Sequence, residues 1–456
     1  MSFDMNRLAG RVLEAGDTGG EDVVGTGEME NRHDSFLDNL PAEWGFDRFK
    51  DVVSLRNEKT DEASAEEDYL ELEDLDSGTG RILSRRNTLE VGSAVTLFKK
   101  GDVLFGKLRP YLEKYWEAEF DGKCTGEILA FKPQRIASRF LFYCVGSRWF
   151  IERCNALAYG AKMPRVSWPT QLSQFNLPLP PLPEQARIAA CLDASCTVVD
   201  TAVAAKRHQL ETLSLLSESL IHQAVTHGLN GRGALKPSGL DWLPNVPKHW
   251  EVRQIKRRCT LLRGKFTHRP RNDPAFYDGE YPFVQTGDIT AAEKYIRNYS
   301  QTLNELGLSV SKVFPKGTLV MSIAANVGDV AILDFEACFP DSMVGLVPNH
   351  HTTLDFLYYL MRAMKTIMLR CAVLTTQLNL NYVRIGTNFA PFPPKTEQAE
   401  IAQFLDTKLA DLRLIVTGIE SQIATLTAYR KSLIHECVTG QRRITEADLN
   451  RVKAHG

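Results

Sequence analysis

Two stretches of the chain carry the same long-period pattern of apolar positions. Between Leu192 and Leu220, the residues spaced alternately four and three apart are apolar, with two polar interruptions. Between Leu405 and Leu433 the same spacing is apolar almost throughout. An apolar residue every 3.5 positions is typical of a helix that buries a narrow seam against another helix. Each stretch therefore predicts one long helix that needs a partner.

The two stretches are copies of each other. PPLPEQARIA, from Pro180 to Ala189, returns as PPKTEQAEIA, from Pro393 to Ala402, and the register continues without a gap to the end of each stretch. Prolines and a first-turn glutamate open both copies, and a glycine follows each where a C-terminal cap is needed. We expect the copies to pack together as an intramolecular antiparallel coiled coil, because two unrelated helices would not keep an ungapped register.

The seam residues that we expect to form the helix–helix contact or to dock a partner are Leu192, Val199, Leu210, Leu213, Leu220, Leu405, Leu412, Ile423, Leu426 and Leu433.

The segments before the two helices are also related, although they have diverged. Leu40-Pro41…Trp44 resembles Leu243-Pro244…Trp250, and FKKGDVL at Phe98 resembles FPKGTLV at Phe314. Short strand patterns broken by glycines, with one or two helices, indicate an α+β fold. The predicted organisation is a leader (1–38), a first head (39–178), a helix (179–230), a linker with a second head (231–391), a second helix (392–441) and a tail (442–456).

Composition restricts the class of protein only broadly. The 456 residues are 43% hydrophobic and 24% charged, with a formal net charge of −2, as in an ordinary globular protein. No signal peptide or membrane-length apolar run is evident, and nine scattered cysteines form no disulfide framework or metal motif. We therefore expect a cytoplasmic protein with reduced thiols, no metal site and no membrane partner. The Gly- and Asp-rich leader is expected to be flexible.

Charge is distributed unevenly along the chain. The segment from Glu58 to Asp76 holds ten acidic residues and one lysine, which favours a solvated acidic face and leaves open an acidic surface for a partner. The segment from Trp250 to Arg271 holds eight basic residues against one glutamate, a formal +7. Basic clusters of this kind suit contact with phosphates, although a solvated surface explains many such runs.

Both heads carry such basic residues, and the second also has side-chain amides suited to reading adenine. The candidate DNA-binding residues are Lys107, Arg109, Lys114, Lys162, Arg165, Arg257, Arg258, Arg263, Lys265, Arg269, Gln377 and Asn379. His222 and His435 recur in register near the helix ends, which indicates a structural role.

Several motifs together resemble the specificity subunits of type I restriction–modification systems. The helix starts LPLPPLPEQ at Leu177 and APFPPKTEQ at Ala390 are the most specific, and KGDVLFGKLRPYL at Lys100 and YGAKMPRVSW at Tyr159 add to them. The second head departs from the pattern, with SIAANVG at Ser322 in place of the Gly-Lys-Leu-Arg-Pro run. Contact residues should therefore not be copied from one head to the other.

The resemblance implies two target-recognition domains, each reading one half of a bipartite DNA site, joined and held apart by the paired helices. It also implies partners: two methyltransferase (M) subunits docked on the helices, and an endonuclease/translocase (R) subunit. On this view the chain has no catalytic residues and no cofactor of its own. S-adenosylmethionine, ATP and Mg²⁺ would serve the partners.

The sequence disfavours two other functions. An enzyme in its own right is disfavoured, because the nearest methyltransferase-like sequence, Asn272 to Phe276, has the wrong register and no cofactor loop precedes it. A coiled-coil scaffold whose heads bind proteins would leave the basic clusters unexplained.

Overall fold

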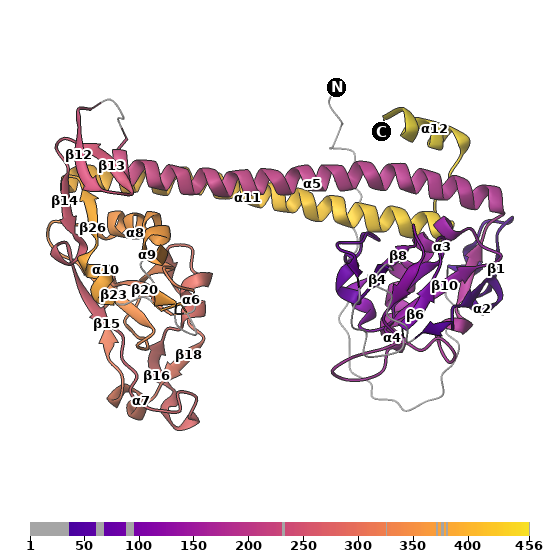
Figure 1. The fold of residues 1–456 in the computed structure, drawn as a ribbon, viewed down its shortest axis with the longest axis horizontal. Coiled ribbons are helices and arrows are strands. Elements are labelled where there is room, and N and C mark those ends of the chain that lie inside the picture. Colours follow the sequence, from indigo (N-terminus) through magenta and orange to yellow (C-terminus); the bar gives the residue numbers. More distant parts are fainter. Residues whose placement is uncertain are drawn as a thin grey trace. The chain divides into compact units, whose positions relative to one another are not determined.

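The computed structural model describes residues 36–60, 68–87, 95–229, 233–324, 326–370, 373–374, 378–379 and 382–455 (Figure 1). The chain forms two compact units. Unit 1 comprises residues 1–195 and 431–456, and unit 2 comprises residues 196–430. Each unit contains one head together with part of each long helix.

Two long helices follow the predicted repeats. Helix α5 runs over Leu182–His227 (46 residues) and α11 over Lys395–Val438 (44 residues). At 1.5 Å per residue each is about 65–70 Å long. The glycine after each helix, Gly228 or Gly440, has a φ of +76°, the left-handed conformation of a C-terminal cap. The predicted caps are therefore confirmed.

Within unit 2 the two helices are antiparallel. Arg430, near the end of α11, forms a 3.1 Å ion pair with Asp200 in the first half of α5. At the other end, Gly228 lies against Glu397 in the first turn of α11. The predicted seam positions are buried or half-buried along both helices, whereas most of their neighbours are exposed. The predicted coiled coil is confirmed.

The first head is built from short strands and helices. One four-stranded sheet has the order β2-β10-β7-β8, a five-stranded sheet has the order β3-β6-β9-β4-β5, and β1 pairs with β11. The strands are β1 Gly45–Arg48, β2 Val53–Leu55, β3 Lys59–Thr60, β4 Asp68–Leu70, β5 Arg86–Asn87, β6 Val95–Phe98, β7 Val103–Gly106, β8 Tyr115–Glu117, β9 Gly122–Cys124, β10 Ile128–Pro133 and β11 Asn176–Leu179. The helices are η1 Leu37–Asn39, α2 Phe49–Val52, η2 Leu72–Asp74, η3 Pro110–Leu112, α3 Ser138–Val145, α4 Arg148–Leu157 and η4 Leu172–Gln174.

The second head follows a hairpin of β12 and β13. Its sheets have the orders β15-β23-β20-β21-β17 and β18-β16-β22-β19, and β14 pairs with β26. The strands are β12 Leu235–Leu240, β13 Leu243–Pro247, β14 Glu251–Gln254, β15 Cys259–Arg263, β16 Tyr277–Phe283, β17 Tyr295–Ile296, β18 Gln301–Leu303, β19 Val313–Phe314, β20 Leu319–Ser322, β21 Val330–Leu333, β22 Ala337–Cys338, β23 Met343–Pro348, β24 Val373–Leu374, β25 Leu378–Asn379 and β26 Phe389–Phe392. The helices are η5 Ile255–Arg257, η6 Pro274–Phe276, α6 Thr286–Ala291, α7 Glu305–Ser309, α8 Leu354–Ala363, α9 Lys365–Arg370 and α10 Tyr382–Thr387.

The heads share one topology. The order β2-β10-β7-β8 in the first head corresponds to β15-β23-β20-β21 in the second, and β6-β9-β4 corresponds to β19-β22-β16. A local hydrogen-bonding motif also recurs in the two heads. Asp74 and Asp288 each close a capping box by accepting a hydrogen bond from the backbone N–H three residues earlier, at 2.8 and 2.7 Å. The α+β class and the duplication of the heads are thus confirmed.

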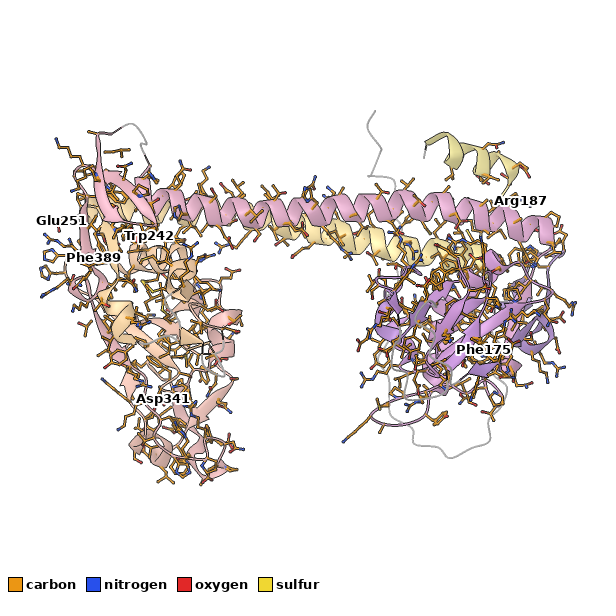
Figure 2. All side chains as sticks on the ribbon, in the orientation of Figure 1. Phe175, Arg187, Trp242, Glu251, Asp341 and Phe389 are labelled. Atoms are coloured by element: carbon orange, nitrogen blue, oxygen red, sulfur yellow. The ribbon has the colours of Figure 1, made fainter. Side chains whose placement is uncertain are left out.

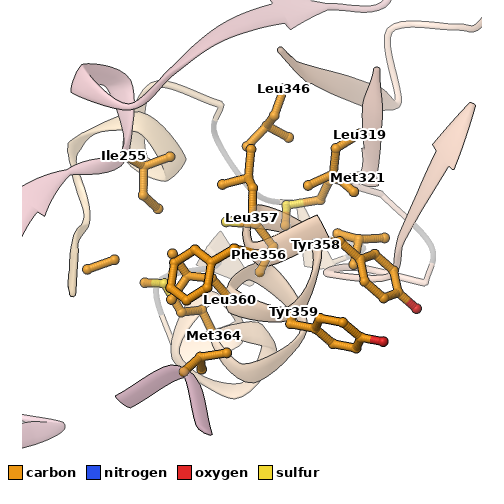
Figure 3. Packing of buried hydrophobic residues seen from close by; sticks show 14 of the residues in the cluster. Ile255, Leu319, Met321, Leu346, Phe356, Leu357, Tyr358, Tyr359, Leu360 and Met364 are labelled. Atoms are coloured by element: carbon orange, nitrogen blue, oxygen red, sulfur yellow. The ribbon is translucent and has the colours of Figure 1, made fainter. Parts of the chain in front are cut away.

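In unit 2 the core joins head and helices. Figure 3 shows α8 side chains such as Phe356 and Leu360 among Leu319 and Leu346 of the sheet. The same buried cluster includes Ile221 of α5 and Leu405 of α11. The apolar seam of the coiled coil therefore continues into the core of the head.

The structure corrects two expectations, one about the leader and one about the acidic segment. The first head begins earlier than residue 39, because Leu37 is buried and the Phe36 ring meets Trp149 edge-on at 5.0 Å. The rest of the leader lies outside the described residues. The acidic segment is not simply a solvated face: Asp74 is fully buried and accepts hydrogen bonds from Ser84 and from Arg86.

The predicted tail is structured as well. It contains α12 (Glu446–His455), and Arg443 binds both Glu184 and Glu43 at 3.1 and 3.0 Å. Arg187, labelled in Figure 2, donates to the carbonyl of Ile444 at 2.7 Å. The tail is therefore fastened to the start of α5.

Helix α5 also corrects the expectation that no apolar run reaches membrane-spanning length. It includes an 18-residue window of mean hydropathy 1.5, long and apolar enough to span a membrane by length and composition alone. That window is 39% buried, and the apolar residues Ile188, Leu192 and Val225 of α5 are buried inside the units.

Candidate nucleic-acid interface

In the first head, two predicted basic segments lie side by side. Lys107–Arg109 follows β7, and Tyr159–Arg165, here called the first-head hairpin, follows α4. Arg109 N–H donates to Pro164 O at 2.7 Å, and Val166 N–H donates to Lys107 O at 3.1 Å. The hairpin is closed by two backbone hydrogen bonds between Tyr159 and Arg165, of 3.0 and 2.9 Å. The fold thus brings the segments that carry Lys107, Arg109, Lys162 and Arg165 together, and their role in binding DNA stays a prediction.

Two of the four cations already have partners. Arg165 forms a two-point ion pair with Glu127, with distances of 3.1 and 3.3 Å. This pairing raises the pKa of Arg165 above its ordinary value. Arg109 donates to Lys162 O at 3.4 Å and has a φ of +51°, an uncommon conformation for a non-glycine residue. Among the described residues, Lys107 and Lys162 have no ion-pair partner.

Large apolar side chains are exposed on the same surface. Tyr159 and Met163 of the hairpin are 58% and 48% exposed, and Tyr111, two residues after Arg109, is 53% exposed. None of the three was among the predicted site residues, although Tyr159 and Met163 lie on either side of Lys162 in the motif YGAKMPRVSW. Lys114, in contrast, is a structural residue, since its ammonium donates to Leu75 O.

In the second head, two carboxylates divide the basic cluster into separate groups. Figure 2 labels Glu251, on the strand pair β14–β26, and Asp341, well apart from it in the same unit. Glu251 accepts from Arg253 at 3.1 Å and from Arg258 at 2.6 Å. The Arg258 side chain is only 12% exposed and its guanidinium lies 5.1 Å from the centre of the Phe392 ring. Its predicted role in DNA contact is not supported, because burial and pairing fix it in the fold.

The other basic group surrounds Asp341. Arg269 donates to this carboxylate at 3.3 Å, and Arg271 forms a second, short ion pair with it. Arg263 and Lys265, both exposed, precede this group at the end of β15. Between them, Gly264 passes so close to Pro340 that a Cβ would lie 2.0 Å from its carbonyl oxygen. The basic strand end is therefore held directly against the segment that carries Asp341.

The remaining predicted residues of the second head are less informative. Arg257 is exposed in η5. Asn379 lies in β25, opposite Val373 of β24, and Gln377 lies outside the described residues. Arg271 and Asp341 were not among the predicted site residues, and no sequence signal links two residues that lie 70 positions apart.

The predicted docking residues divide into two kinds. Leu192, Val199, Leu405 and Leu433 are buried in the units. Leu210, Leu213, Leu220, Leu412, Ile423 and Leu426 are half-buried. Polar contacts that the sequence prediction missed fasten each head to its helix: Asp193 accepts from Tyr143 at 2.6 Å, and its counterpart Asp406 accepts from Tyr359 at 2.5 Å and Lys294 at 2.6 Å.

The sequence predicts that the cysteines are reduced thiols and that the chain has no metal site. In the described part of the chain, eight cysteines are buried and lie outside disulfides, and burial raises the pKa of the Cys124 and Cys259 thiols to about 12. No group of three or more His, Cys, Asp or Glu residues in this part is arranged to hold a metal ion.

The fold and these surfaces define a two-headed α+β protein with duplicated heads clamped to a shared antiparallel helix pair. Residues 247–425, which lie in the second head and the adjoining helix, match the family model described as the type I restriction modification DNA specificity domain.

Two curated relatives point the same way. The EcoDI type I restriction enzyme specificity subunit of Escherichia coli is 27% identical over 191 residues, which is 41% of this chain and 43% of that protein. The putative MjaX type I restriction enzyme specificity subunit of Methanocaldococcus jannaschii is 27% identical over 284 residues, or 60% and 61% of the two chains. The chain thus aligns with roughly half of the length of these relatives.

The fold has a close counterpart among solved structures. A chain from "Structural basis underlying complex assembly and conformational transition of the type I R-M system" superposes with a TM-score of 0.70 at 20% identity, covering 88% of this chain and 99% of that one. The protein is accordingly HsdS-like, that is, similar to the specificity subunits of type I restriction–modification systems.

Proposed function

We propose that this chain is the DNA-recognition subunit of a type I restriction–modification complex. Each head reads one half of a bipartite target, and the paired helices set the gap between the half-sites. The chain itself is non-catalytic, and methylation and cleavage belong to its partners. The observation that carries the proposal is the duplication of a whole head, with one topology but different surface chemistry, on a common helix pair.

The electrostatics of the heads support DNA as the ligand. In the first head, Lys107 and Lys162 lie on two segments joined by backbone hydrogen bonds, and Tyr159 on the second segment is exposed. In the second, Arg263 and Lys265 extend from a strand end. Cations suit the phosphates and exposed aromatic or apolar side chains suit base edges, so each head offers both elements of sequence-selective binding. A near-neutral net charge is compatible with this function if partner subunits share the phosphate contacts.

We further propose that the partners are two methyltransferase subunits, docked on the helices, and an endonuclease/translocase subunit, all in the cytoplasm. Two adjacent pairs of exposed apolar residues, Leu215–Leu216 on α5 and Leu414–Ile415 on α11, support a docking role, since contiguous exposed apolar surface marks interaction sites. S-adenosylmethionine, ATP and Mg²⁺ would be bound by these partners. The alternative, a scaffold whose heads bind proteins, leaves the cationic surfaces without a purpose.

Binding to randomised duplex DNA tests the proposal. The full chain, purified together with its methyltransferase partner, should enrich a single two-part sequence, and its affinity should fall steeply with salt. Enrichment of no sequence by an intact complex, together with salt-insensitive binding to a protein, would favour the scaffold.

A further inference from the structure

The two heads place a hairpin at the same point of their topology. In the first head, the first-head hairpin Tyr159–Arg165 follows α4 directly. In the second head, β24 and β25 pair antiparallel directly after α9, with Val373 opposite Asn379. Helices α3 and α4 precede the one hairpin as α8 and α9 precede the other.

The two hairpins have unrelated sequences between their paired residues. The first has Gly-Ala-Lys-Met-Pro between Tyr159 and Arg165, and the second has Thr-Thr-Gln between Leu374 and Leu378. Two recognition heads on one scaffold must keep the same fold and differ in the residues that read the bases. An equivalent hairpin with an unrelated sequence is the pattern expected of such a reading element.

The first-head hairpin is rigidly based and has an exposed tip. Its arms are joined by backbone hydrogen bonds between Tyr159 and Arg165, and Arg165 is clamped by Glu127. Its tip is fixed from the side by Arg109, which donates to Lys162 O. Lys162 and Met163 are nevertheless exposed, so the tip presents an ammonium and a thioether side by side to solvent.

We propose that the first-head hairpin is the base-reading element of the first head, with Lys162 and Met163 at base edges in a DNA groove. Lysine donates to guanine O6 and N7 in the major groove, where the apolar methionine side chain suits contact with a thymine methyl group. Lys107, on the neighbouring segment, binds phosphate beside the groove. The proposed ligand is double-stranded DNA, because basic side chains lie next to exposed apolar side chains in both segments. This inference rests on the proposed function of the chain.

Selection from a randomised duplex pool tests the inference in the assembled complex. The double variant Lys162→Ala/Met163→Ala should lose its preference, at least tenfold, at one or more positions of one half-site only. The half-site read by the second head should be selected as before, which shows that the complex is folded. Lys132→Ala and Leu83→Ala, which remove an exposed lysine and an exposed leucine from elsewhere on the same head, should change neither half-site.

The outcomes separate the two proposals. If the wild-type complex selects a two-part site and the double variant selects the identical site, the hairpin does not read bases and the inference is wrong. Loss of both half-sites together would also overturn it, because the hairpin would then act on the whole molecule. If the wild-type complex selects nothing, the proposed function itself fails.

Discussion

Gln185 and Gln398 make the same pair of hydrogen bonds in the two units. Each accepts from the backbone N–H that precedes a head helix, Ala137 at 2.7 Å and Thr353 at 2.8 Å. Each donates to a proline carbonyl just before its own long helix, at 2.8 and 2.9 Å. Both side chains are buried. The Glu-Gln repeat that marks the helix starts is thus a joint that fixes each head to its helix.

Truncation of this glutamine side chain should lower the stability of the unit that contains it. Gln398→Ala should destabilise unit 2 by about 1–3 kcal/mol, because the Thr353 N–H and the Pro393 and His351 carbonyls lose their hydrogen-bond partner. Thermal unfolding, followed by circular dichroism, measures the change. Gln403→Ala, at an exposed position of the same helix, should leave the unfolding temperature unchanged. Equal effects of the two substitutions would show that the joint contributes nothing.

Lys107 and Arg258 should behave differently although both were predicted DNA ligands. Lys107→Ala should weaken binding to all sequences and reduce the salt slope of binding by about one unit, as expected for a phosphate contact. Arg258→Ala should lower the unfolding temperature and leave the salt slope unchanged, because Arg258 is buried against Phe392 and paired with Glu251. Titrations at several salt concentrations distinguish the two, and a reduced slope for Arg258→Ala would contradict its structural assignment.

Asp341 should restrain the affinity of the second head for DNA. It pairs with Arg269 and Arg271, so Asp341→Asn frees two guanidinium groups for phosphates. We expect tighter binding to unrelated sequences and a salt slope steeper by about one to two units. Asp411→Asn on α11 makes the same change of net charge outside the head and should have little effect. An effect of equal size from both variants would indicate net charge alone.

His435 should make stability depend on pH. It is half-buried, with its Nδ1 unpartnered among the described residues, and burial lowers its pKa below the ordinary value, with a smaller contribution from Arg148. A lowered folded-state pKa favours the neutral ring, so the stabilisation is complete above about pH 6.5 and is lost as the pH falls below it.

Unfolding temperatures at pH 7.5 and 5.5 test this dependence. His435→Leu should reduce the difference between the two values, whereas His208→Leu, at an exposed position of α5, should not. Methylation by the complex should survive His435→Leu, since the residue has a structural role. Abolished methylation without unfolding would contradict that role.

The helix pair was predictable from sequence, and the details of the interface were not. A 3.5-residue period of apolar positions, repeated in register, shows which residues of each helix face the other helix. The burial of Leu192 and Leu405 follows from this period. The heads consist of strands as short as two residues, whose pairing depends on partners far away in the chain. For the same reason the sequence shows how many basic residues the heads contain but not which of them form ion pairs. Only the fold reveals that Arg271 pairs with Asp341 and that Arg258 pairs with Glu251.

The helices should act as a ruler if the proposed function is right. Adding one heptad in the same register to both helices lengthens each by about 10 Å, or roughly three base pairs of DNA. The gap between the recognised half-sites should grow accordingly, as read by selection from a duplex pool. An unchanged gap in a folded, active complex would refute the ruler.

The most direct test of the central claim is a methylome. The chain is expressed with its methyltransferase partner, and modified adenines are mapped by single-molecule sequencing of the host DNA. The account predicts one bipartite motif, methylated on both strands, with a constant unspecified gap. An assembled, active complex that methylates without any such motif would contradict it.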